Sequence, residues 1–308
     1  MRNAALKTVE NMVKSSDRAC FIGSDLGFGT LQNLRDTHPE RVLMEGIAEQ
    51  QIIGFSAGIS ASGYFPIVHT IATFLTRRSF EQIAMDFSLQ NLSGMLLGAG
   101  GGMVYAPLGP THQAIDDFAL MSSIPNLKVY APADPIEIEN LMLQSFERNE
   151  LSYFRIGRGG EPNITAEFEI IGNGAVKYKT NGDTFTLITT GTLLHEALEA
   201  FTALAESGLK GSLIHIPLLN HESDTELRKL IADTENVFVF EEHIPIGGLF
   251  SHLANGIFKF IHSSITLHFS LPHQYAKNYG SQSAHRALNN IDAVGIYNTV
   301  KGVLTNAG

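Results

Sequence analysis

The segment FPIVHTIATFLTRRSFEQIAMDFSLQNLSGMLLG, residues 65–98, contains two short apolar runs separated by a stretch long enough for a helix. Two parallel strands need a crossover of this kind, because a tight hairpin turn joins only antiparallel strands. This alternation of apolar runs and helix-length segments predicts a mostly parallel sheet flanked by helices. It recurs along the first half of the chain, where the apolar runs are 20–23, 41–44, 65–71, 94–98, 127–131 and 151–156.

The clearest helix in the sequence is predicted over residues 134–148. Asp134 can cap its first turn, Pro135 suits its first helical position, and Glu137 can complete a capping box. Apolar residues at helical spacing then form one face of this helix, which we expect to be buried. They are Ile138, Leu141, Met142 and Phe146.

Two α/β domains are expected along the chain. Its 308 residues can form two cores, since compact domains usually run to ~100 to 200 residues each. Residues 166–183 lie in a stretch rich in Gly and Asn, which interrupts the helical pattern and predicts a linker. The first domain would then be 1–165 and the smaller second domain 184–308. Strand-like runs in the second domain are 184–190, 212–216, 237–241 and 265–269.

Composition excludes several classes of partner. The formal charge of −10 and the absence of a basic stripe argue against nucleic acid. No apolar run approaches the ~20 residues that a membrane-spanning helix needs. The only cysteine, Cys20, has no partner for an internal disulfide, and the first residues form an amphipathic pattern rather than an apolar signal segment. We therefore expect a cytoplasmic protein.

The segment EGIAEQQIIGFSAGISASG, residues 45–63, places Glu49 on an apolar helix face. Glu49 stands three and four positions before Ile52 and Ile53, and that spacing brings the three side chains together. An ordinary solvated acid in a first helical turn, favoured there by the helix dipole, is the alternative. A row of small residues on this helix would let another backbone approach closely and suggests an interface: Gly54, Ala57, Gly58 and Ala61.

Two further segments carry an aromatic ring, a guanidinium and an imidazole. Phe74 and Arg77 are three positions apart and would point the same way from a helix. Core packing by Phe74, with a surface pair between Arg77 and Glu81, is the alternative. His112 follows Gly109 and Pro110 on a predicted loop, where a polar side chain can reach a ligand. A structural role is the alternative for His112.

In this order, GIAEQ at 46–50, the Phe74 segment and GPTHQ at 109–113 resemble the pyrimidine-binding domain of the transketolase family, which includes deoxyxylulose-phosphate synthase. The resemblance extends over essentially the whole chain. FIGSDL precedes the glutamate segment, FRIGRG closes the first domain, and VFVFEEHIPIGG is similar to the family's C-terminal domain.

The resemblance implies thiamine diphosphate as the cofactor. Glu49 would hydrogen-bond the ring nitrogen N1′ of the cofactor's aminopyrimidine, and sharing a proton there activates the cofactor. Phe74 would stack on the pyrimidine ring. Arg77 would lie beside that ring, and Asp25 would lie near the cofactor at the boundary between two subunits.

The resemblance also implies residues that bind the substrate. His112 would face the substrate's oxygens and move protons. Arg155 and Arg158 would hold a substrate phosphate, because a planar guanidinium suits two phosphate oxygens, although solvated linker charge is the alternative. Leu108 replaces an aspartate that contacts a donor hydroxyl, and Ile71 replaces a second aromatic. A donor with less oxygen, such as a 2-oxo acid, is therefore as plausible as a ketose phosphate.

Full-length relatives begin with a domain whose Gly-Asp-Gly motif holds Mg²⁺ and the diphosphate, and this sequence contains no such motif. We therefore expect a separate partner subunit of similar size, an α2β2 assembly, Mg²⁺ ligands on the partner and none on this chain. The predicted activity is transfer of a two-carbon ketol or acyl unit from a ketose or 2-oxo acid to an aldehyde.

Three other functions fit parts of the sequence less well. The β subunit of a 2-oxo-acid dehydrogenase first component shares the two-domain layout, but GPTHQ is not typical of it. A noncatalytic regulatory or scaffold subunit is disfavoured by the joint presence of Glu49, Phe74 and His112. A metal hydrolase is disfavoured because the histidines include no HExxH or comparable spacing.

Overall fold

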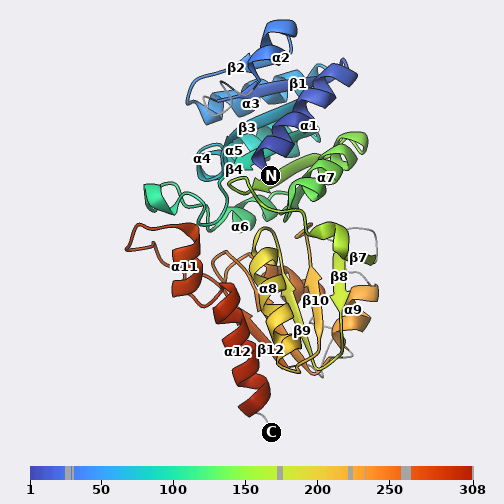
Figure 1. Ribbon diagram of the computed structural model, residues 1–308. Helices are drawn as coiled ribbons and strands as arrows, with labels where there is room; N and C mark the ends of the chain where they lie inside the picture. Colours follow the sequence, from blue (N-terminus) through green and yellow to red (C-terminus); the bar gives the residue numbers. More distant parts are fainter. Residues whose placement is uncertain are drawn as a thin grey trace.

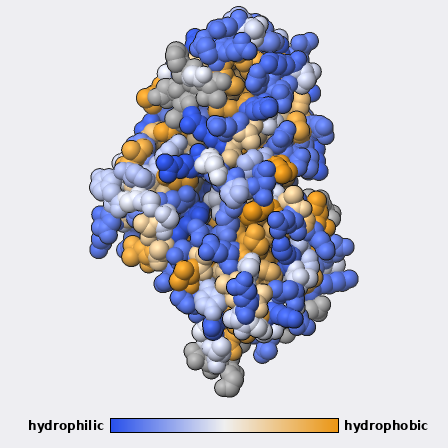
Figure 2. All heavy atoms as spheres, in the orientation of Figure 1, coloured by the Kyte–Doolittle hydropathy of each residue, from blue (hydrophilic) through white to orange (hydrophobic). Residues whose placement is uncertain are grey.

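The computed structural model describes residues 1–24, 29, 31–171, 176–220, 225–232, 234–257 and 265–306. Two sheets lie one after the other along the molecule, the first built from the N-terminal half of the chain and the second from the C-terminal half (Figure 1). Hydrophilic side chains cover most of the face drawn in Figure 2, with apolar residues scattered among them. Among the described helices, none has the length and apolar character needed to cross a bilayer.

The first sheet has six parallel strands in the order β2-β1-β3-β4-β6-β5. All residues of β1, β4 and β6 are buried, as expected for a parallel sheet that helices cover on both faces. The predicted parallel sheet is confirmed. Its strands are β1 (Ala19–Gly23), β2 (Val42–Met44), β3 (Phe65–Ile71), β4 (Gly94–Ala99), β5 (Leu127–Tyr130) and β6 (Leu151–Ile156).

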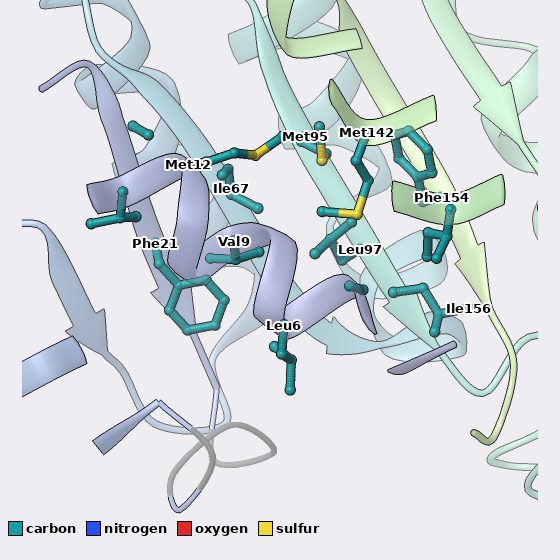
Figure 3. Packing of buried hydrophobic residues seen from close by; sticks show 14 of the residues in the cluster. Leu6, Val9, Met12, Phe21, Ile67, Met95, Leu97, Met142, Phe154 and Ile156 are labelled. Carbon is teal, nitrogen blue, oxygen red and sulfur yellow. The ribbon is translucent and has the colours of Figure 1, made fainter. Parts of the chain in front are cut away.

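Helices cover the two faces of this sheet with two separate cores. Phe21 packs in one core, whereas its neighbour Ile22 packs in the other, because successive side chains of a strand point to opposite faces. Helices α1 (Arg2–Ser15) and α7 (Pro135–Glu147) close the first core (Figure 3). The remaining helical segments of this domain are α2 (Gln32–Thr37), α3 (Glu49–Ala61), α4 (Ala72–Arg78), α5 (Phe80–Gln82), a π-helical segment (Ile83–Ser88) and α6 (Asp117–Ser122).

Helix α7 begins as the sequence predicts, with one difference. The side chain of Asp134 accepts a hydrogen bond from the amide of Glu137 at 2.9 Å, which caps the helix. The carboxylate of Glu137 reaches past the capping residue to the amide of Ala133, at 2.8 Å. It also lies 2.8 Å from Nε2 of His215, which belongs to the second domain. Glu137 therefore joins the two domains instead of completing a capping box.

The second sheet has the order β12-β11-β9-β10-β8-β7. Four strands are parallel: β9 (Phe185–Thr189), β10 (Ser212–His215), β11 (Asn236–Phe240) and β12 (Ile265–Phe269). Two buried clusters line its two faces. The helices of this domain are α8 (Leu193–Glu206), α9 (Thr225–Ala232), α10 (Leu249–Gly256), α11 (Gln282–Leu288) and α12 (Ala293–Asn306).

The residues predicted to form a linker, 166–183, contain two strands. β7 (Glu169–Ile171) pairs antiparallel with β8 (Val176–Thr180), and β8 pairs antiparallel with β10 at one edge of the second sheet. β7 is the edge strand, and most residues of both strands are partly buried or exposed, so polar residues such as Lys177 and Lys179 of β8 weaken the apolar signal in the sequence. The Gly and Asn residues that suggested a linker flank these strands.

A buried ionic network joins the two domains. Arg155 of β6 donates to both carboxylate oxygens of Asp117 and, from Nη1, to the backbone oxygen of Glu242 at 3.0 Å. The carboxylate of Glu242 in turn pairs with Arg286 and accepts from the amide of Met103 at 2.6 Å. Because these groups are buried and partnered, the network fixes how the second domain sits on the first.

Candidate active site

Glu49 is the first residue of helix α3 and is buried, with an exposed fraction of 3%. Ile52 and Ile53 behind it are fully buried, so the carboxylate does lie on an apolar helix face as its spacing predicts. The helix dipole favours an acid at this end of α3. A carboxylate sheltered from water requires a polar partner, which the structure supplies from α4.

That partner is Arg78, the last residue of α4. Its Nη1 donates to Oε2 of Glu49 at 3.1 Å, and its guanidinium carbon lies 3.8 Å from the centre of the Phe74 ring. The sequence prediction missed Arg78. Phe74 and Arg78 are four positions apart on one helix, so the spacing that suggested Arg77 also allows Arg78.

Arg77 makes a paired contact with an acidic side chain of its own domain. Its Nη2 and Nε donate to the two carboxylate oxygens of Asp116, at 2.8 and 3.1 Å. This paired geometry uses the planar fork of the guanidinium. Arg77 and Asp116 line a cavity of about 350 Å³ together with His273 and Tyr275 from the second domain. The predicted place of Arg77 beside the pyrimidine ring stays a prediction, whereas Arg78 is the arginine that contacts the carboxylate of Glu49.

His112 packs on the edge of Phe74. The two rings are 5.0 Å apart between centres, at an angle of 65°. The hydroxyl of Thr111 lies 3.0 Å from Nδ1 of His112. Phe74 thus brings together the acid of α3, the guanidinium of α4 and the imidazole of the loop.

The loop that carries His112 is held at both ends. The amides of Gly102 and Ala114 each donate to the other's carbonyl oxygen, at 2.9 and 3.0 Å. Within the loop Gly109 adopts a φ of +83°, which favours glycine, and a Cβ there would lie 2.7 Å from the ring of Tyr279. The second domain therefore packs directly against the predicted substrate loop.

Several polar atoms next to these residues have no partner. Oγ1 of Thr73 and both amide atoms of Gln113 are buried without a hydrogen bond to any described residue. Thr73 directly precedes Phe74, and Gln113 directly follows His112. Buried polar groups are nearly always partnered in complete structures, so these atoms fit a site that accepts a polar ligand.

Arg155 lies at the junction of the two domains. It is 9% exposed, its guanidinium lies 3.6 Å from the centre of the Phe118 ring, and its donors serve Asp117, Ala114 and Glu242. Burial opposes ionisation of Asp117, but the neighbouring guanidinium outweighs it and holds the pKa of this carboxyl below its ordinary value. These contacts occupy the guanidinium of Arg155, and its predicted phosphate contact stays a prediction.

Family models match both halves of the chain. The model described as "Transketolase, pyrimidine binding domain" matches residues 1–161, and "Transketolase, C-terminal domain" matches residues 174–284. This chain belongs to the transketolase family. Glu49, Phe74, Arg78 and His112 all lie within the pyrimidine-binding domain of the family.

The curated relatives of this transketolase-family chain include two kinds of named enzyme. A 1-deoxy-D-xylulose-5-phosphate synthase of Dehalococcoides mccartyi is 31% identical over 88% of this chain. The chain spans only 42% of that protein's length. One subunit of an apulose-4-phosphate transketolase, from Phocaeicola vulgatus, is 29% identical over 72% of each chain.

Solved structures in the family share the fold. One described as "Split gene transketolase, inactive beta4 tetramer" superposes with a TM-score of 0.85 at 26% identity, covering 99% of this chain and 98% of its own. The transketolase of Campylobacter jejuni superposes with a TM-score of 0.79 at 17% identity, over 96% of this chain and 45% of its own. The two-domain architecture of this transketolase-family chain is therefore shown as a whole.

Two further predicted residues remain predictions. Arg158 lies exposed after β6 and makes no ion pair or hydrogen bond with any described residue, so its guanidinium is available to a ligand. Asp25 lies outside the described residues. In the described part of this transketolase-family chain, no group of three or more His, Cys, Asp or Glu side chains could hold a metal ion.

Proposed function

We propose that this chain is the pyrimidine-binding subunit of a split, thiamine-diphosphate-dependent transketolase-type enzyme. The observation that carries the proposal is the buried carboxylate of Glu49, linked to the flat ring of Phe74 through the guanidinium of Arg78, in a domain of the matching family. A carboxylate for a ring nitrogen and an aromatic face for stacking are what an aminopyrimidine needs.

The residues present fit the aminopyrimidine part of the cofactor. Glu49 would accept or share a proton at N1′, Phe74 would stack on the ring, and the unpartnered amide of Gln113 could serve further polar atoms. When bound, thiamine diphosphate supplies a nucleophilic carbon and an electron sink for cleaving the bond beside a carbonyl. The apolar residues behind Glu49 exclude water from the shared proton.

His112 would act on the substrate. Its position on the edge of Phe74 places it next to the ring that would carry the cofactor. An imidazole changes protonation near neutral pH, so it can donate a hydrogen bond to a substrate oxygen or move a proton there. The exposed guanidinium of Arg158 is a candidate for a substrate phosphate.

We expect His112→Ala to lower kcat/KM for the donor by ~10²-fold, at the lower end of what proton transfer contributes. The affinity for thiamine diphosphate should stay near that of the wild type. Both are measured by steady-state kinetics of the assembled enzyme, with His38→Ala, just after α2, as the control histidine. An effect confined to cofactor affinity would contradict the substrate role of His112.

The donor is a ketose phosphate or a 2-oxo acid, and the acceptor is an aldehyde. Leu108, 54% exposed just before Gly109, cannot accept a hydrogen bond from a sugar hydroxyl. The relatives named for deoxyxylulose phosphate and for apulose 4-phosphate both refer to sugar phosphates. A comparison of pyruvate with ketose phosphates as donors would separate the two classes.

A separate partner chain would hold the diphosphate and Mg²⁺. Two observations support it: this chain spans 98% of a solved structure described as a split-gene transketolase, and 72% of a relative named as a subunit of an apulose-4-phosphate transketolase. We propose an α2β2 assembly with each active site between unlike subunits.

We expect the purified chain to bind thiamine diphosphate and Mg²⁺ weakly on its own, because it offers contacts only to the aminopyrimidine. Adding the partner chain should raise the affinity by ~10²-fold or more, since the charged diphosphate is then neutralised as well. Isothermal titration calorimetry of each chain and of the mixture measures this. Tight stoichiometric binding by the isolated chain would refute the split-site proposal.

A further inference from the structure

A single side chain makes both of the contacts that the proposed site offers to an aminopyrimidine. The guanidinium of Arg78 donates to Oε2 of Glu49 and covers the ring of Phe74, at 3.8 Å from guanidinium carbon to ring centre. Glu49 has a polar side-chain partner in the described residues only through this arginine. Arg78 thus occupies both the carboxylate of Glu49 and the face of the Phe74 ring.

Guanidinium and aminopyrimidine resemble each other chemically. Both are planar, and both contain an N–C–N unit. A guanidinium donates from its N–H groups to a carboxylate, and the ring nitrogen N1′ would share a proton with the same carboxyl group, so each can stack on an aromatic face while it is bonded to Glu49. A lysine could supply the charge but not the flat face, so the arginine matches the ligand in shape as well as in polarity.

We propose that Arg78 is an internal ligand that takes the place of the aminopyrimidine in the cofactor-free chain and swings out when the cofactor binds. This inference rests on the proposed function, since it assigns the displaced group to the same site. It adds Arg78 as a positioning residue. Until the cofactor binds, Arg78 provides a partner for the buried carboxylate of Glu49 and covers the face of the Phe74 ring.

The position of Arg78 permits this exchange. Its side chain is 48% exposed, so the guanidinium can turn into water. Arg78 is the last residue of α4, and Ser79 after it has left helical geometry, with φ of −111° and ψ of 21°. Arg77 is held elsewhere, because its Nε and Nη2 both donate to the carboxylate of Asp116. The exchange therefore needs a side-chain rotation and no change in the helix.

The full-length chain without its partner allows a direct test with 4-amino-5-hydroxymethyl-2-methylpyrimidine, which carries the ring and lacks the diphosphate. We expect Arg78→Ala to bind this probe ~3- to 10-fold more tightly than the wild type, because no internal ligand competes. Arg78→Lys should fall between the two. The dissociation constants come from ligand-observed NMR titrations.

Arg148→Ala is the matched control, because Arg148 directly follows the last residue of a helix, is exposed and pairs with Glu150 at 3.9 Å. This variant should bind the probe like the wild type. In Arg78→Ala, the further change Glu49→Ala should abolish the gain in affinity. A gain that survives in the double variant would place the probe elsewhere and overturn the inference.

The assembled enzyme separates this inference from the proposed function. Arg78→Ala should lower the KM for thiamine diphosphate by a similar ~3- to 10-fold, whereas loss of a residue that holds the cofactor would raise it. An unchanged or raised KM overturns the role of Arg78 and leaves the proposed function intact. Turnover that does not depend on thiamine diphosphate in any variant would overturn the proposed function instead.

Discussion

Glu49→Ala is expected to abolish turnover by the assembled enzyme, with a loss of ~10³- to 10⁴-fold in kcat, at the upper end of what a positioned acid or base contributes. The carboxylate is buried at the start of α3 and is bonded to Arg78. Without it, the described part of the proposed site would lose the carboxylate that shares a proton with N1′. Steady-state kinetics at saturating cofactor measures the loss.

Two comparisons sharpen this experiment. Glu49→Gln keeps the size and shape of the side chain but cannot take up the shared proton, so it should lose nearly as much activity as the alanine variant. Gln50→Ala changes the next, exposed residue of the same helix and should leave turnover near normal. Size-exclusion chromatography checks that each variant still assembles. Near-normal activity of Glu49→Ala would remove the central assignment.

Asp117→Ala is expected to lower the free energy of unfolding by about 3–5 kcal/mol, because it leaves a buried guanidinium without its carboxylate. Asp117 is fully buried, and it accepts from Arg155 and, at 2.7 Å, from the hydroxyl of Tyr153. Urea unfolding at 25 °C gives the difference. Glu167→Ala, which breaks an exposed pair with Lys179 at 3.0 Å, should cost less than about 1 kcal/mol.

The loss of stability in Asp117→Ala should also depend on pH. The pKa of Asp117 is lower in the folded state than its ordinary value, because the attraction of Arg155 outweighs burial. The carboxylate therefore contributes stability above its unfolded pKa and loses it as pH falls through the folded pKa. The difference in the free energy of unfolding between the wild type and Asp117→Ala should therefore become smaller at acidic pH. A difference that does not change with pH would argue that packing, and not the ion pair, accounts for the loss of stability.

The elements of the fold could be predicted because their signals are local. The strands β3 and β6 are runs whose residues pack on both faces, so their apolar character shows directly in the sequence. Helix α7 was predictable from Asp134 and Pro135. β8 was missed although VKYKT alternates apolar and polar residues as a partly exposed strand does, because the glycine and asparagine around it indicated a linker.

The candidate site was predictable in part. The burial of Glu49 followed from its spacing to Ile52 and Ile53, since one helix fixes which side chains share a face. The choice between Arg77 and Arg78 did not follow, because both spacings are helical and the outcome depends on Asp116, which lies 39 positions away from Arg77. Contacts over such separations are set by tertiary packing and leave no local pattern.

The domain junction also limits where such a protein can be divided. The loop with His112 is tied to the second domain through the amide of Met103, which donates to Glu242, and through Gly109, which lies under Tyr279. Cutting the chain between its two domains would remove these contacts from the loop. It would also expose the buried ion pairs of the domain junction to water. The second domain therefore stabilises the loop at the proposed active site. We expect that a truncated chain without this domain would not keep the conformation of the predicted substrate loop.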